Sequence, residues 1–329
     1  MSKMTYFEDV TQTVGNTPLV KIRKLTANRG IRATVLVKLE FFNPTASVKD
    51  RMAIYMLNAA AKSGQLKPNS TIIEATSGNT GAAAAMYGAA HGHKVILTIP
   101  DKMSSEKIDT LKAFGAEVHI CLTAVPPDDP RSYYETAKAL AAKCDEPFML
   151  NQYHSPDNIG AHYNTTGPEI WAQTEGQIDV FVAGVGTGGT MSGTARFLKE
   201  QKPEIEIVAV DIEGSVFYDY FKNGELPEPH PYLVEGIGDD MLCQALDFSV
   251  IDEMYKIDDK TSFLMGRELA HEEGILAGGS SGSAVHAALQ HAKGLDESKT
   301  VVVILPDAGS KYVSKMYNDN WMREKGFLE

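Results

Sequence analysis

The 329-residue chain is longer than a single hydrophobic core usually requires, so we expect two lobes with a cleft between them. Its hydrophobic content of 43% and charged content of 22% are typical of globular proteins and argue against a disordered, fibrous or membrane protein. The formal net charge of -12 disfavours nucleic acid and anionic lipid as partners, because both repel an acidic protein.

Short apolar, β-branched runs alternate along the chain with longer Ala-rich stretches. In chain order, the pattern predicts a strand at 35–37, a helix at 52–61, a strand at 71–73, a helix at 82–90, strands at 94–99 and 179–183, a helix after Met191, a strand at 205–210, a helix at 261–273 and a strand at 301–305. This alternation is typical of repeated βαβ units and predicts an α/β fold with mostly parallel sheets covered by helices. The proline-containing segments 123–130 and 223–231 are predicted to be loops.

Lys49 is the first candidate for a reactive residue, in a segment that leads from a predicted strand into the helix expected near Met52. The positive end of a helix dipole destabilises an ammonium group and favours the neutral amine that a Schiff base requires. A solvated surface lysine would fit the same pattern, so the position alone does not establish a catalytic role.

The segment 76–81, Thr-Ser-Gly-Asn-Thr-Gly, lies between a predicted strand and the helix at 82–90. Its hydroxyl and backbone N–H groups converge at a helix N-terminus, where a carboxylate or phosphate can be bound. A plain capped turn is the alternative. Because two glycines and three hydroxyl residues exceed what a cap needs, we favour contact with a ligand.

The segment 184–190, Gly-Val-Gly-Thr-Gly-Gly-Thr, also joins a strand to a helix, and its glycines allow the backbone to approach a phosphate closely. Its spacing also satisfies Gly-x-Gly-x-x-Gly, and Asp211 follows at about 20 residues, as in dinucleotide-binding sites. A nicotinamide-dependent oxidoreductase is therefore a distant alternative. That interpretation leaves Lys49 and the segment 76–81 without roles.

The segment 278–283, Gly-Gly-Ser-Ser-Gly-Ser, precedes an Ala-rich helix, and Pro306 and Asp307 end the last predicted strand. Residues at the carboxyl ends of strands commonly line the ligand crevice of open α/β sheets, so we expect both segments to border one cleft. The histidines at 91, 93 and 271 lack metal-binding spacing, and we expect no metal.

The three cysteines, Cys121, Cys144 and Cys243, are far apart and not in Cys-x-x-Cys spacing. This pattern suits reduced, buried thiols in a cytosol. The first residues contain no apolar run that could serve as a secretory leader, and no later run approaches a membrane span. We therefore expect a cytoplasmic protein without membrane contact.

Lys49, the segments 76–81 and 186–190, and Ser280 occur in this order in the cysteine synthase and cystathionine β-synthase family of pyridoxal-phosphate enzymes, which the chain resembles over almost its whole length. Four further segments look most like cystathionine β-synthase, namely 103–107, 152–153, 235–238 and 321–328. The resemblance implies pyridoxal 5'-phosphate as cofactor and the fold of the tryptophan synthase β-subunit (fold type II), with two lobes that are each an open, mostly parallel sheet flanked by helices. The smaller, mobile lobe would be 45–150 and carry the loop for the substrate carboxylate. The larger lobe would be 1–44 plus 151–329 and carry the loop for the cofactor phosphate.

The resemblance also implies roles for individual residues. Lys49 would form the Schiff base with the cofactor and act as the base at the substrate's Cα. The other implied cofactor contacts are Asn79 at the 3' oxygen, Gly186, Thr187, Gly188, Gly189 and Thr190 at the phosphate, Ser280 at the pyridine nitrogen, and Pro306. The implied substrate contacts are Thr76, Ser77, Gly78, Thr80, Gln152 and Tyr153 for the amino acid, and Gly236 for the path of the nucleophile.

A serine hydroxyl at the pyridine nitrogen makes the cofactor a weaker electron sink than a carboxylate does, which favours β-elimination and replacement over transamination. We therefore expect replacement of the β-substituent of serine or O-acetylserine by a thiol. Homocysteine, giving cystathionine, is the first choice of acceptor, and a cysteine synthase using sulfide is the alternative. A non-catalytic binding protein on the same scaffold is a further hypothesis, and the family resemblance suggests a homodimer.

The sequence departs from the family pattern at two places. Thr45 and Ala46 stand where several β-synthases have glycines, and Asp239 stands where the animal enzymes have an aromatic residue, so both places bear on substrate preference. The animal enzymes also carry a haem-binding extension and a C-terminal regulatory pair. Since the chain starts near its first motif and stops after Phe327, we expect neither haem nor regulation by adenosylmethionine.

Overall fold

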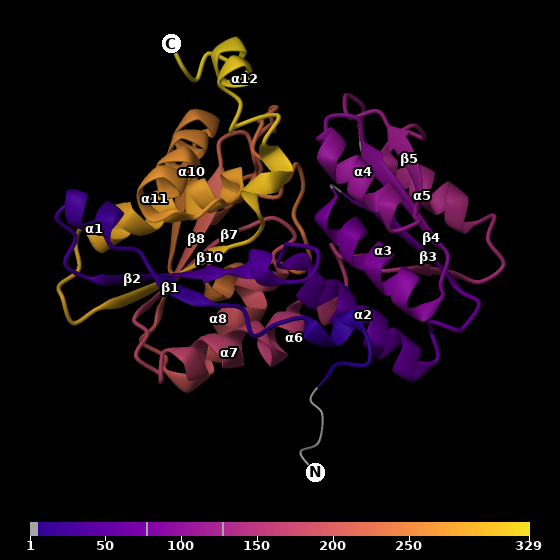
Figure 1. The fold of residues 1–329 in the computed structure, drawn as a ribbon, viewed down its shortest axis with the longest axis horizontal. Coiled ribbons are helices and arrows are strands. Elements are labelled where there is room, and N and C mark those ends of the chain that lie inside the picture. The colour runs from indigo at the N-terminus through magenta and orange to yellow at the C-terminus, as the bar shows by residue number, and fades with distance from the viewer. Residues whose placement is uncertain (1–5, 77, 127) are drawn as a thin grey trace. The chain divides into compact units, whose positions relative to one another are not determined.

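The computed structural model describes residues 6–76, 78–126 and 128–329, which form two compact units (Figure 1). The first unit contains the described part of Met1–Asn16 together with Asn43–Asn151. The second unit contains Thr17–Phe42 and Gln152–Glu329. Among the described residues, no helix combines the length and the apolar character needed to cross a bilayer.

The first unit is a parallel sheet with helices packed on it. Its elements are η1 (Val10–Thr13), α2 (Lys49–Ser63), β3 (Thr71–Ala75), α3 (Asn79–His91), β4 (Val95–Pro100), α4 (Ser105–Ala113), β5 (Glu117–Cys121), α5 (Tyr133–Ala141) and β6 (Pro147–Met149). The four strands pair in the order β5-β4-β3-β6, all parallel. Helices α3 and α5 pack on the central strands β3 and β4, and α2 packs on α3.

The second unit is a larger sheet with helices on both faces. Its elements are β1 (Leu19–Lys21), α1 (Lys24–Asn28), β2 (Thr34–Leu39), η2 (Glu40–Phe42), α6 (Pro156–Asn164), α7 (Thr166–Gln173), β7 (Val180–Gly184), α8 (Gly189–Gln201), β8 (Glu206–Ile212), α9 (Phe217–Asn223), η3 (Phe248–Val250), β9 (Glu253–Ile257), α10 (Asp259–Glu273), α11 (Gly279–Ala292), β10 (Thr300–Leu305), η4 (Gly309–Tyr312) and α12 (Asp319–Glu324). The six strands pair in the order β1-β2-β10-β7-β8-β9. Strand β1 runs antiparallel to β2, and the other neighbours are parallel.

Successive residues of the central strands enter two separate cores of the second unit. On β7, Val180 and Val182 face the core shared with α10 and α11, whereas Phe181 and Ala183 face the core shared with α7 and α8. Figure 1 shows these two helix pairs on opposite sides of the sheet. Since successive side chains of a strand point to opposite faces, a strand covered by helices on both sides is apolar throughout. The predicted α/β fold with mostly parallel sheets is thus confirmed.

The predicted strands and helices each overlap an element of the predicted type. Helices α2 and α8 begin earlier than predicted, at Lys49 and Gly189. The predicted start of α8 is too late because glycine has a low helix propensity. In the structure, Gly188 and Gly189 form the turn into the helix. The described parts of the two predicted loops contain no strand or helix, except that Asn223 ends α9.

The division into units differs from the predicted lobes near the N-terminus, where residues 1–44 were assigned to the larger lobe. The described part of Met1–Asn16 belongs instead to the first unit. The reason is contact: η1 packs on α3, and the backbone N–H of Gly15 donates to Oδ1 of Asn43 at 2.8 Å. Asn43, Pro44 and Asn151 also belong to the first unit.

Candidate active site

Lys49 is the first residue of α2, as the sequence indicated, and its side chain is half-buried. Its backbone N–H donates to Oγ of Ser47 at 3.3 Å. The loop before it is held by Asp50, a fully buried carboxylate that accepts hydrogen bonds from the backbone N–H of Thr45 at 2.7 Å and from the Thr45 hydroxyl. These contacts fix the point at which the lysine leaves the backbone.

The segment 76–81 forms the turn from β3 into α3. Oγ1 of Thr76 accepts hydrogen bonds from the backbone N–H groups of Gly78 at 3.0 Å and Gly81 at 3.2 Å, so this buried hydroxyl caps the helix. The capped turn that the sequence left as an alternative is therefore present, and a carboxylate-binding role for Thr76 stays a prediction. Ser77 lies outside the described residues.

The turn into α3 requires glycine at position 78. Gly78 has a φ of +118°, and a Cβ there would lie 2.9 Å from Cδ of Lys107, which is itself 4% exposed. Asn79 and Thr80 follow as the first two residues of α3, the former half-buried and the latter buried. The predicted ligand residues of the first unit therefore lie at the starts of α2 and α3, two helices that pack on each other.

The glycine segment 184–190 turns from β7 into α8 through Gly188, which has a φ of +94°. A Cβ on Gly188 would lie 2.5 Å from Cα of Leu246, and one on Gly189 would lie 1.9 Å from Oδ1 of Asn158. The N-cap residue of α8 is Gly188, which has no side chain that could cap the helix. The positive end of the helix dipole favours an anion at this turn.

Two threonine hydroxyls of this segment lie against α6. Nδ2 of Asn158 donates to Oγ1 of Thr187 at 3.0 Å, and Nε2 of His162 lies 3.2 Å from Oγ1 of Thr190. Asn158 and His162 are each 1% exposed and stand four residues apart, which places both on one face of the helix. Sequence analysis did not identify either residue. Ser155 and Pro156, typical of a helix start, would have indicated α6.

The carboxyl end of β10 brings further predicted residues to the same edge of this sheet. Pro306 directly follows β10, which pairs with β7. The backbone N–H of Gly278 donates to the carbonyl of Asp307 at 3.0 Å, so the start of α11 lies beside this strand end. Ser280, in the first turn of α11, is 3% exposed. The two segments are therefore neighbours, and their place at one cleft stays a prediction.

The segments 236–238 and 152–153 also lie beside the glycine segment. The backbone N–H of Gly238 donates to the carbonyl of Val185 at 2.7 Å. Gly236 is exposed, with a φ of +82°, and a Cβ at this position would meet no atom within 4 Å. The carbonyl of Gln152 accepts a hydrogen bond from Asn158 at 2.8 Å, and that of Tyr153 accepts one from the backbone N–H of Ala245 at 3.3 Å.

Asp211 does not fit the role that a dinucleotide site would assign to it. The side chain is fully buried, with Oδ1 accepting from the backbone N–H of Ile212 at 2.9 Å and Oδ2 from that of Tyr218 at 2.8 Å. Burial raises the pKa of Asp211 to about 6, partly offset by these hydrogen bonds. Both oxygens bind backbone groups at the turn into α9, so the carboxylate is not presented to a ribose.

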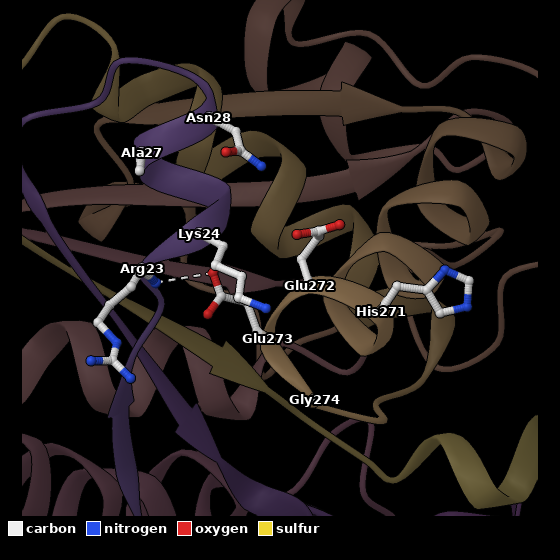
Figure 2. A pocket seen from close by; sticks show the side chains of 8 residues that line it. All are labelled: Arg23, Lys24, Ala27, Asn28, His271, Glu272, Glu273 and Gly274. Atoms are coloured by element: carbon white, nitrogen blue, oxygen red, sulfur yellow. Dashed lines mark hydrogen bonds between the residues drawn. The ribbon is translucent and has the colours of Figure 1, made fainter.

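A hollow of about 690 Å³ lies between α1 and the end of α10 (Figure 2). Figure 2 shows the side chains of Arg23 and His271 at opposite edges of it. Oε1 of Glu273 accepts hydrogen bonds from the backbone N–H groups of Arg23 at 2.9 Å and Leu25 at 2.8 Å, which secures α1 to α10. None of the predicted site residues lines it. In the described parts of the chain, no group of three or more His, Cys, Asp or Glu side chains could hold a metal ion.

Known proteins match nearly the whole chain. A sequence profile of the family "Pyridoxal-phosphate dependent enzyme" matches residues 10–307. The chain is 43% identical over 321 residues to the cystathionine beta-synthase of Mus musculus, covering 98% of this chain and 57% of that protein. It therefore spans less than two thirds of the length of this relative.

Two solved structures are similar to the chain. The O-acetylserine dependent cystathionine beta-synthase from Helicobacter pylori has a TM-score of 0.86 and 36% identity, covering 95% of this chain and 99% of that one. A hydrogen sulfide-producing enzyme from Fusobacterium nucleatum has a TM-score of 0.86 and 35% identity, covering 94% of this chain and 98% of that one.

Proposed function

This chain belongs to the family of pyridoxal-phosphate dependent enzymes, and from that premise we propose that it replaces the β-substituent of a serine-like amino acid by a thiol. Serine or O-acetylserine is the proposed donor. Homocysteine is the proposed acceptor, giving cystathionine, and the cysteine synthase reaction with sulfide is the second candidate. The observation that carries the proposal is the start of α8, where a glycine turn, a helix N-terminus with glycine as its N-cap and two threonine hydroxyls fit a phosphate group.

The phosphate-binding residues in this proposal are Gly186, Thr187, Gly188, Gly189 and Thr190. Glycine is required at 188 and 189 by the approach of Leu246 and Asn158, so the backbone there is bare and its N–H groups can reach an anion. No lysine or arginine stands in this segment, so the site would hold the phosphate through hydrogen bonds and the helix dipole.

Lys49 is the proposed attachment point and proton carrier. When bound, pyridoxal phosphate supplies an electron sink that stabilises negative charge at the substrate's Cα. The Nζ of Lys49, once released from the cofactor, would take the proton from Cα. Asn79, at the start of α3, is proposed to donate to the cofactor's 3' oxygen. Its place at a helix start supports this role, because an anionic oxygen is stabilised there.

Ser280 is the proposed partner of the pyridine nitrogen, with Pro306 beside the ring. A hydroxyl is neutral, so it leaves the nitrogen without the full positive charge that a carboxylate partner would maintain. Negative charge at Cα is then stabilised less strongly, which favours rapid loss of a group from Cβ over transfer of the amino group. The burial of Ser280 and its place beside the end of β10 support this assignment.

The substrate carboxylate is proposed to bind Thr76, Ser77, Gly78, Thr80, Gln152 and Tyr153. Oγ1 of Thr76 accepts two backbone N–H bonds, so its hydroxyl proton remains to be donated, and a carboxylate accepts such a proton. Gly236 is the proposed lining of the thiol's path. Gly236 is exposed and the space around its Cα is open, which supports this role because it leaves room for a second substrate.

The choice of donor and acceptor rests on relatives. The similar enzyme from Helicobacter pylori depends on O-acetylserine, and the one from Fusobacterium nucleatum produces hydrogen sulfide. We also propose a homodimer located in the cytoplasm. The family resemblance supports the former, and three cysteines without a disulfide support the latter.

The proposal is tested with the purified holoenzyme and its Lys49→Ala variant. We expect the wild type to be yellow and bleached by borohydride, to form cystathionine from O-acetylserine or serine with homocysteine, and to lose turnover when Lys49 is replaced. Lys62→Ala, at the exposed end of the same helix, is the matched control and should retain turnover. A colourless wild type, or unchanged turnover in Lys49→Ala, would refute the proposal. Product analysis with sulfide in place of homocysteine decides between the two acceptors.

A further inference from the structure

Asn158 lies on α6 and contacts two segments to which the proposed function gives different ligands. Its Nδ2 donates to the backbone carbonyl of Gln152 at 2.8 Å and to Oγ1 of Thr187 at 3.0 Å. The side chain is 1% exposed. Gln152 belongs to the residues proposed for the substrate carboxylate, and Thr187 to those proposed for the cofactor phosphate. One buried amide therefore holds a member of each set.

The orientation of this amide follows from its contact with Gln152. A backbone carbonyl can only accept a hydrogen bond, so the nitrogen of the Asn158 amide, and not its oxygen, must face Gln152. The second hydrogen of the same nitrogen is then directed at Thr187, whose hydroxyl oxygen acts as the acceptor. The proton of the Thr187 hydroxyl is consequently left to be donated to another group, and a phosphate oxygen accepts such a proton.

The packing around Asn158 leaves little room for another arrangement. A Cβ on Gly189 would lie 1.9 Å from Oδ1 of Asn158, so the absence of a side chain at 189 allows the amide to lie directly against the start of α8. An amide confined in this way cannot exchange its nitrogen and oxygen without losing the bond to Gln152.

We infer that Asn158 is a positioning residue, which directs the Thr187 hydroxyl proton toward the cofactor phosphate and fixes the backbone at Gln152. The inference rests on the proposed function. At position 158, a side chain of the same shape without N–H groups can only accept a hydrogen bond from the Thr187 hydroxyl. The inference predicts that the hydroxyl proton will then point to residue 158 and no longer to the phosphate.

Asn158→Asp makes this change, and Asn164→Asp is its matched control. Asn164 is exposed at the end of the same helix, so the control adds the same charge to α6 at an exposed position. The measurement is the dissociation constant of pyridoxal phosphate from each purified protein, obtained by titrating the apoenzyme. We expect at least about a tenfold increase for Asn158→Asp, the effect of one buried hydrogen bond to a charged group. For Asn164→Asp we expect a change within about twofold, as for other surface substitutions.

A double-mutant cycle with Thr187 separates a positioning role of Asn158 from a general loss of stability. Thr187→Val removes the hydroxyl that Asn158 is inferred to orient, so Asn158→Asp should weaken cofactor binding markedly less in the Thr187→Val background than in the wild type. Thermal unfolding of the apoproteins, with and without added cofactor, reports whether the variants are folded and how much the cofactor stabilises each. If Asn158→Asp does not fold, Asn158→Ala replaces it in the same cycle.

The outcomes distinguish the two proposals. A wild type that binds no pyridoxal phosphate overturns the proposed function and the inference with it. A wild type that binds, together with Asn158→Asp binding equally well, overturns the inference alone. Equal effects of Asn158→Asp in both backgrounds, or an equal effect of Asn164→Asp, also overturn it, because the change would then not act through Thr187.

Discussion

Gly188 is the residue at which the structure makes the sharpest prediction about stability. Its φ of +94° lies in the region that costs an L-residue about 1–2 kcal/mol. A Cβ there would also lie 2.5 Å from Cα of Leu246 and 2.6 Å from its backbone nitrogen, and neither atom is a flexible side-chain end. Relief of such an overlap by backbone movement costs about 1–3 kcal/mol. Gly188→Ala should therefore lower the free energy of unfolding by about 2–5 kcal/mol.

The matched control for Gly188→Ala is Gly224→Ala. Gly224 has a φ of +74° at the end of α9, and no atom lies within 4 Å of a Cβ built there. This variant carries the backbone strain without the overlap, so it should lose only about 1–2 kcal/mol. Urea unfolding of the two variants and the wild type, under one set of conditions, isolates the contribution of Leu246.

Cofactor affinity supplies an independent measurement for the same pair of variants. If the backbone at Gly188 shifts away from Leu246, the first N–H groups of α8 shift with it, and pyridoxal phosphate should bind more weakly to Gly188→Ala than to Gly224→Ala. Equal losses of stability in the two variants, with equal cofactor affinity, would refute the reasoning, because the glycine segment would then not be held against Leu246.

Two further predictions concern buried charges in the second unit. Lys38 is fully buried, donates to the carbonyl of Thr17 at 2.6 Å and forms an ion pair with Glu169. Because Lys38→Met leaves the Glu169 carboxylate without this partner, it should lower the free energy of unfolding, measured in urea, by about 3–5 kcal/mol, and the double variant Lys38→Met/Glu169→Gln should recover part of the loss. A loss below about 1 kcal/mol in Lys38→Met would contradict this prediction. Asp211, whose pKa burial raises to about 6 from 3.8, retains its proton in the folded protein at pH values where the unfolded chain has lost it. The stabilisation that comes from this raised pKa is full below pH 3.8 and is lost as the pH rises through about 6. The free energy of unfolding of the wild type, relative to that of Asp211→Asn, should therefore fall by about 3 kcal/mol between pH 3.5 and pH 7. A difference that does not vary with pH would contradict the burial argument.

The elements that could be predicted from sequence are those whose burial is nearly complete. β10 and β7 are apolar and β-branched because helices cover both faces of their sheet, and such runs are recognisable without a structure. The elements that were missed are short or only partly buried. β5 lies at the edge of its sheet with Ile120 exposed, so its residues show no alternation, and β6 has three residues.

In the candidate site, the residues at strand-to-helix turns could be predicted from the sequence, whereas the residues that depend on tertiary contacts could not. Lys49 and the glycine-containing turns occur where a strand meets a helix, and both the residue types and their order along the chain are visible in the sequence. Asn158 and His162 are polar residues whose burial depends on α6 packing against α8, which is a tertiary contact. A polar residue in a sequence resembles a surface residue until its neighbours in space are known.

Ala46, one of the departures from the family motif, has a backbone conformation that favours glycine. It has a φ of +58°, the left-handed conformation that glycine adopts most easily. The conformation is supported by two contacts: the backbone N–H of Ala46 donates to the carbonyl of Asn43 at 2.8 Å, and Asp50 binds the neighbouring Thr45. The loop that leads to Lys49 therefore follows a glycine-like path although glycine is absent.

Asp239 is a departure of a different kind, because it changes charge. Its backbone N–H donates to Oγ of Ser215 at 3.1 Å, which fixes the backbone directly after Gly238. A carboxylate at this position, in place of an aromatic ring, alters the electrostatics next to the residues proposed to line the thiol's path. Of the two departures, we therefore expect the one at position 239 to bear more directly on the proposed choice of thiol.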